Sequence, residues 1–131
     1  MKKLITILLL ASYIFASDFS QDYEKTIEQA KKEHKSIYIL MTSSSCGWCR
    51  KFENTTLKNK KVMDKLKSNY LLLHLDKDFD DYPEKFKVKR VPSHFFITSD
   101  EKIIYQFPGY WNDDNFLSFV DDINKTIEKA L

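Results

Sequence analysis

Two cysteines, Cys46 and Cys49, are the residues of this chain whose type and spacing could do chemistry. They are the only cysteines among the 131 residues, and they form a Cys-Gly-Trp-Cys motif. In an α-helix, residues three positions apart lie on the same side, about one turn from each other. One thiol held in this way can attack a partner disulfide while the other resolves the mixed disulfide, which is reversible dithiol–disulfide exchange.

The position of the motif in the chain supports this chemistry. The run from Ile37 to Met41 is apolar without polar alternation, which predicts a central strand covered on both faces. A helix is predicted from Cys46 to about Leu57. The first turn of a helix carries unpaired amide groups and a partial positive charge, so we expect a lowered pKa for the Cys46 thiol. Cys49, one turn further along, is then the expected resolving thiol.

Three other interpretations of the cysteine pair stay open. A purely structural disulfide would close so short a loop that it removes little entropy from the unfolded chain. A zinc site would need two further ligands, and His34, His74 and His94 are not paired at ligand spacing. The motif could also have lost its redox activity and serve only as the scaffold of a binding surface. We expect no metal and no organic cofactor.

The elements around the motif predict an α/β domain. An N-terminal helix is followed by a strand–helix–strand unit, and then by a hairpin and a closing helix. This order predicts a mixed central sheet (βαβ, then ββα) with helices on both faces. The residues that define these elements are Phe19, Tyr23, Ile27 and Ala30 for the first helix; Val62, Met63 and Leu66 for a helical piece before the strand Tyr70 to Leu75; an acidic loop from Asp76 to Glu84; the hairpin strands Phe95 to Ile97 and Ile103 to Phe107; and Asn112 as the cap of a helix with an apolar stripe at Phe116, Phe119, Val120, Ile123 and Ile127.

The start of the chain has the layout of a secretory signal peptide. A short basic segment with Lys2 and Lys3 precedes an apolar run, and small residues lead to Ala16. We expect residues 1–16 to be removed and residues 17–131 to form one domain in the periplasm or outside the cell. The alternative is an uncleaved N-terminal membrane anchor.

Composition excludes several other classes of protein. The two glycines, Gly47 and Gly109, are too far apart to form a dinucleotide or phosphate loop. The net charge is only +2, and removal of residues 1–16 lowers the basic count from 21 to 19, equal to the 19 acidic residues. A neutral domain has no electrostatic reason to bind nucleic acid, so we expect no nucleic-acid partner.

The chain resembles the thioredoxin superfamily over nearly all of residues 17–131. The apolar strand, the motif opening a helix, Val91-Pro92 about forty residues later, a hairpin, Gly109 and a terminal amphipathic helix occur in the order typical of that family. The resemblance implies a thioredoxin-like fold in which Pro92 is cis and packs beside the disulfide, and in which Val91 contacts the substrate backbone. Independently, a proline entering a strand has no N–H for the ladder, which marks a sheet edge or a special turn.

The segment from Cys49 to Thr56 is similar to a narrower branch, which contains the C-terminal domain of the transmembrane thiol–disulfide interchange reductase. This resemblance implies an exported, monomeric thiol–disulfide oxidoreductase that reduces disulfides in periplasmic proteins. Its implied partners are exported protein thiols and a redox partner protein, such as a membrane electron donor or a cytochrome c maturation factor. A dithiol oxidase that introduces disulfides and a non-catalytic binding adaptor remain the alternatives.

Four further residues are candidates around the cysteines. Leu40 stands where cytosolic thioredoxins have a buried acid, so Glu53, one turn after Cys49, is a candidate for proton transfer or tuning. A solvated position on the helix surface near Arg50 and Lys51 is the alternative for Glu53. His94, two residues after Pro92, is a second candidate for tuning, with a structural role as its alternative. Trp48 and Tyr110 are expected to offer an apolar surface to a peptide-like partner, although local packing would also explain both.

Overall fold

The computed structural model describes residues 18–130. The predicted signal peptide, its cleavage after Ala16 and the alternative membrane anchor therefore lie outside the described residues. Within residues 18–130, none of the helices combines the length and the apolar character needed to cross a bilayer.

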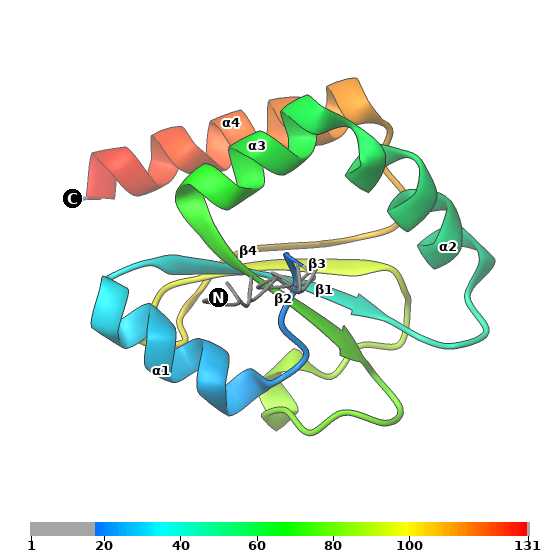
Figure 1. Cartoon of the computed structure of the whole chain (residues 1–131), viewed down its shortest axis with the longest axis horizontal. Coiled ribbons are helices and arrows are strands. Elements are labelled where there is room, and N and C mark those ends of the chain that lie inside the picture. The colour runs from blue at the N-terminus through cyan, green and yellow to red at the C-terminus, as the bar shows by residue number, and fades with distance from the viewer. Residues whose placement is uncertain (1–17, 131) are drawn as a thin grey trace, which may run out of the picture.

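A four-stranded mixed sheet forms the centre of the fold, with the strand order β2-β1-β3-β4 (Figure 1). β1 (Ser36–Thr42) pairs in parallel with β2 (Tyr70–Asp76). On its other side β1 pairs antiparallel with β3 (Ser93–Ile97), which forms a hairpin with β4 (Ile103–Pro108). The predicted βαβ unit and hairpin are both confirmed.

Helices cover both faces of this sheet. In Figure 1, α1 lies on one face, while α3 and α4 lie side by side on the other, with α2 at the end of the same layer. The helices and short 3-10 turns have the following bounds: α1 Tyr23–Glu33, α2 Gly47–Asn54, η1 Thr56–Lys58, α3 Lys60–Asn69, η2 Glu84–Phe86 and α4 Asp113–Ala130.

The alternating side chains of β1 divide the core into two layers. Tyr38 and Leu40 point into the cluster beneath α2, α3 and α4. Ile37, Ile39 and Met41 point into the cluster beneath α1. All five are at most 1% exposed, which explains why the strand lacks polar alternation.

Two helix boundaries differ from the sequence prediction. The first helix begins at Tyr23 rather than near Phe19, because the backbone of Ser20 pairs with β2. Its N–H donates to Leu72 O at 2.9 Å, and its carbonyl accepts from His74 N at 2.8 Å. Asp22 then caps α1 by accepting from Lys25 N at 3.0 Å. The helix after Cys46 ends at Asn54, before η1.

The start of α4 agrees with the sequence prediction. Asn112 caps the helix, because its side-chain oxygen accepts a hydrogen bond from Asn115 N at 3.0 Å. Of the predicted apolar stripe, Phe116, Val120 and Ile123 are buried, whereas Phe119 and Ile127 at its edge are half-buried. The cap and the stripe together fix how α4 leaves the loop after β4.

Candidate active site

Cys46 and Cys49 form a disulfide at the N-terminus of α2, with their Cα atoms 5.2 Å apart. Cys46 is the N-cap residue in an extended conformation, and Cys49 N donates a hydrogen bond to its Sγ at 3.1 Å. Cys49 is completely buried, whereas Cys46 is partly exposed. The amide of Cys49, which has no acceptor within the first helical turn, therefore points at the sulfur that solvent can reach.

The loop before β3 brings Val91 and Pro92 to the disulfide. The peptide bond between them is cis. The Sγ of Cys46 lies 3.5 Å from the carbonyl oxygen of Val91. Pro92 is buried, and its own carbonyl accepts a hydrogen bond from Gly109 N at 2.7 Å. The loop after β4 thus supports the loop that touches the cysteines.

His94 lies in the core, and both of its ring nitrogens have partners. Nε2 is 2.8 Å from the carbonyl oxygen of Gly109, which can only accept, so Nε2 must carry the proton. Nδ1 then accepts from the hydroxyl of Tyr38 at 2.7 Å. Burial lowers the pKa of His94 to about 4, although the bond to Gly109 opposes the shift. His94 is therefore neutral at pH 7, and it connects to Pro92 through Gly109.

Glu53 belongs to a separate polar group on the side of α2 that faces β2. Its carboxylate lies 3.1 Å from Arg50 Nε and 3.5 Å from His74 Nε2. Thr42 Oγ1 is 2.8 Å from the same nitrogen of His74. Burial lowers the pKa of His74 more than the nearby Glu53 raises it, so the contact with Glu53 at neutral pH joins a carboxylate to an uncharged imidazole. Sequence reasoning did not find His74 as a partner of Glu53.

Aromatic side chains from the first turn of α2 and from the loop after β4 form a rim beside Cys46. Trp48 is 60% exposed, and its ring lies 5.7 Å from that of Tyr110. Lys51 Nζ lies over both rings, 5.0 Å from the centre of Trp48 and 4.8 Å from that of Tyr110. Trp111, by contrast, packs against Phe119 of α4 at 4.6 Å. Trp48 and Tyr110 are thus brought together with the cysteines.

A groove of about 630 Å³ opens directly at the disulfide. Its lining includes Cys46, Trp48, Val91 and two basic residues, Lys89 and Arg90. Neither basic residue was singled out by the sequence analysis, although they immediately precede Val91-Pro92 in the chain. Their position beside the proline was the signal that could have identified them.

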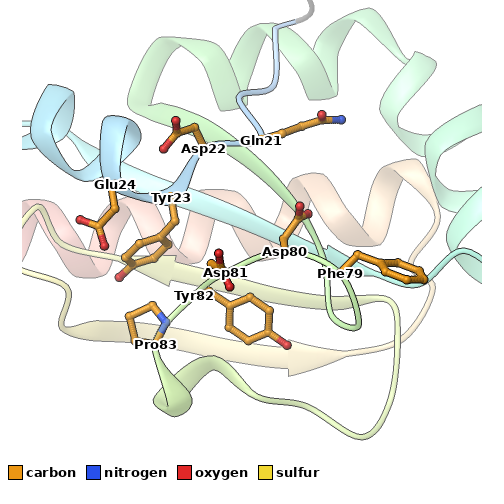
Figure 2. A pocket seen from close by; sticks show the side chains of 9 residues that line it. All are labelled: Gln21, Asp22, Tyr23, Glu24, Phe79, Asp80, Asp81, Tyr82 and Pro83. Carbon is orange, nitrogen blue, oxygen red and sulfur yellow. The ribbon is translucent and has the colours of Figure 1, made fainter.

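A second cavity, of about 660 Å³, lies between the start of α1 and the loop after β2 (Figure 2). None of the predicted site residues lines it. Two of its carboxylates serve local structure, because Asp22 caps α1 and Asp80 accepts from Asp76 N at 2.6 Å. Within residues 18–130, no three His, Cys, Asp or Glu side chains gather closely enough to hold a metal ion.

Comparison with curated proteins finds a relative that matches only a short segment of the chain. The chain is 27% identical over 55 residues to spermatogenesis-associated protein 20 of Mus musculus, a match that covers 42% of this chain. The matched segment is only 7% of the length of that protein. Nothing about the activity of this chain therefore follows from the mouse protein as a whole.

Solved structures and a family model match much more of the chain. The DsbH oxidoreductase is 21% identical with a TM-score of 0.65, covering 93% of this chain and 95% of that one. The oxidised C-terminal domain of DsbD from Neisseria meningitidis is 18% identical with a TM-score of 0.64, covering 79% and 97%. These likenesses show the thioredoxin-like fold. The family model for a thioredoxin-like domain matches residues 23–124, most of the chain, so this protein belongs to the thioredoxin-like domain family.

Proposed function

We propose that the chain is an exported thiol–disulfide oxidoreductase that reduces disulfides in periplasmic proteins. The observation that carries this proposal is the disulfide between Cys46 and Cys49 at the start of α2, next to Val91-Pro92. A helix N-terminus stabilises a thiolate, and a neighbouring thiol allows the captured partner to be released. The fold and the disulfide pair are those of thioredoxin-like oxidoreductases.

The unequal burial of the two sulfurs supports different roles for them. Cys46 is partly exposed in the groove, which suits the sulfur that meets a partner disulfide. Cys49 is completely buried, so a bulky partner cannot reach it. Cys46 is then the attacking sulfur and Cys49 the resolving one.

The reaction balances as two successive exchanges. In the dithiol form, the thiolate of Cys46 attacks one sulfur of the substrate, which breaks the substrate disulfide, forms a mixed disulfide and releases a thiolate that takes up a proton. Cys49 then loses its proton and attacks Cys46 Sγ, which breaks the mixed disulfide and releases the second substrate thiol. The substrate gains two electrons and two protons, and the chain ends with its own disulfide. A dithiol partner protein must supply two electrons for the next turnover.

The surroundings of the cysteines have supporting roles in this proposal. The exposed ring of Trp48 and the ring of Tyr110 offer apolar contact to a peptide, and Val91 lies where a substrate backbone would run beside Cys46. His94 is a positioning residue, because it reaches the proline loop only through Gly109. Glu53, held by Arg50 and His74, is the candidate for handling the proton of the resolving thiol.

The reducing direction and the location rest on the sequence. The segment after Cys49 resembles the reductase branch, which favours electron flow towards the substrate. Residues 1–16 resemble a signal peptide, which favours the periplasm. Mass spectrometry of the protein secreted by its host is expected to find an N-terminus after Ala16. A protein that retains residues 1–16 would contradict the proposed cleavage.

Trapping of a mixed disulfide tests the catalytic assignment. The full chain with Cys49→Ala is incubated with a disulfide-containing protein substrate, and Cys46→Ala is the matched control. We expect a mixed disulfide with the first variant and none with the second, because only Cys46 is accessible. Absence of the species in both variants would support a binding adaptor, and equal trapping by both would refute the division of roles.

The reduction potential tests the direction. Equilibration with glutathione is expected to give a value nearer to that of thioredoxin, about −270 mV, than to that of the oxidant DsbA, about −120 mV. A potential near the second value would make the chain a dithiol oxidase.

A further inference from the structure

Two cations line the groove at the disulfide, and a third lies over the aromatic rim beside it. Lys89 and Arg90 line the groove from the loop before Val91, and Lys51 lies on the first turns of α2, over the aromatic rim. None of the residues that line the groove is acidic. The exposed side of Cys46 is therefore bordered by cations. We call Lys51, Lys89 and Arg90 the basic collar.

The cations of the collar lack anionic partners. Among residues 18–130, no carboxylate lies within ion-pair distance of Lys51, Lys89 or Arg90, and Lys89 and Arg90 are both exposed. Neighbouring cations behave differently, because Arg50 pairs with Glu53 at 3.1 Å and Lys87 pairs with Glu84 at 2.6 Å. The collar cations thus differ from the two cations that stand closest to them in the chain, each of which is paired with a carboxylate.

The acidic residues near this end of the sheet lie on another side. Asp76 and Asp80 line a separate cavity together with Arg50 and His74, beyond the buried side of α2. The larger acidic cavity in Figure 2 lies further away, against the start of α1. The charges at this end of the sheet are thus divided, with cations at the cis-proline loop before β3 and carboxylates after β2.

We propose that the basic collar selects disulfides whose cysteines are flanked by acidic residues. The inference rests on the proposed function and names its substrate class: a polypeptide segment with Asp or Glu next to the cysteine that Cys46 attacks. A peptide that runs beside Val91 passes Lys89 and Arg90, the two preceding residues of the chain. Its flanking carboxylates then lie next to cations that have no other anion to bind.

The expected effect follows from the exposure of these charges. An exposed ion pair in water favours association by a factor of about two to three at low ionic strength. Two flanking acids together therefore favour reduction of an acidic peptide over a neutral one by about fivefold. Salt at about 0.5 M shortens the screening length to a few ångströms, so the preference should then fall below about twofold.

Competing peptides test the proposal. Three disulfide-bridged peptides that differ only beside the cysteine, with Asp, Asn or Lys on both sides, are reduced by the full chain in its dithiol form. Initial rates are measured at low salt and at about 0.5 M salt. We expect the order Asp, then Asn, then Lys, with the Asp-to-Asn ratio collapsing in salt.

A double variant and a matched control assign the effect to the collar. In the variant Lys89→Gln/Arg90→Gln the Asp-to-Asn ratio is expected to fall to about one. Lys31→Gln/Lys32→Gln also removes two exposed cations, from the end of α1 at the opposite end of β1 from the disulfide, and should keep the ratio of the unmodified chain.

The outcomes separate this inference from the function on which it rests. If all three peptides are reduced at equal rates, or the preference survives high salt, the oxidoreductase activity stands and the charge selection is refuted. If Lys31→Gln/Lys32→Gln lowers the ratio as much as Lys89→Gln/Arg90→Gln does, the effect belongs to overall charge and the collar is refuted. If no peptide is reduced, both proposals fail.

Discussion

Lowering the pH should destabilise the folded chain through His94. The ring is buried and neutral, and burial lowers its pKa from 6.5 to about 4. Between these two values the unfolded chain binds a proton at this position and the folded chain does not. The stability that His94 contributes is therefore fully present above about pH 6.5 and is lost as the pH falls towards 4.

The size of the loss follows from the two pKa values. Each unit of pKa corresponds to about 1.4 kcal/mol, so the full loss below pH 4 is about 3 kcal/mol. Between pH 7 and pH 5, the unfolding free energy should decrease by about 2 kcal/mol from this residue alone. Small domains have unfolding free energies of about 5–15 kcal/mol, so the chain should remain folded and measurable at both pH values.

Urea denaturation at pH 7 and at pH 5 measures this loss. His94→Gln cannot titrate, so its unfolding free energy should fall by about 2 kcal/mol less over this interval than that of the unmodified chain. The pKa of His74 is also lowered by burial, but it contributes to both proteins and cancels in the difference. The comparison therefore isolates His94.

Tyr38→Phe is the matched control. It removes the hydroxyl that donates to His94 Nδ1 at 2.7 Å and leaves the ring buried. We expect a loss of about 1–3 kcal/mol at pH 7, because a buried acceptor loses its donor, while the pH dependence persists. The reasoning would be refuted if the unmodified chain and His94→Gln lost the same stability between pH 7 and pH 5.

Two further predictions concern the helix that carries the cysteines. Glu53→Gln removes the nearby negative charge that raises the pKa of His74. NMR titration should therefore find a still lower pKa for this imidazole than in the unmodified chain. An unchanged or higher pKa would show that the carboxylate does not act on the ring. Phe52→Ala removes a fully buried ring that contacts His94 and Phe116, with ring centres 4.8 and 5.2 Å away, and should lower the unfolding free energy in urea by about 3–5 kcal/mol. A loss below about 1 kcal/mol would contradict the burial of this ring, because even a site that collapses loses the transfer free energy of the removed atoms.

Local signals were sufficient for most of the fold. The apolar run of β1, the stripe of α4 and the cap at Asn112 are written in neighbouring residues, and each was predicted with the correct element type. Phe19 was wrongly assigned to the first helix, because its spacing matches a helical stripe. The backbone of Ser20 instead pairs with β2, a contact across more than fifty residues that no local pattern reveals.

The cysteine pair and the order of elements follow from the sequence because they depend on spacing along the chain. The partners of the site do not, since they depend on long-range pairing and on where each side chain points. Tyr110 meets Trp48, and Gly109 joins His94 to Pro92, only because β3 and β4 place the loop at 109–112 beside α2. The place of Lys89 and Arg90 next to the proline can be read from the sequence. That they lie beside Cys46 without a carboxylate to pair with depends on how distant segments pack, so only the folded chain shows it.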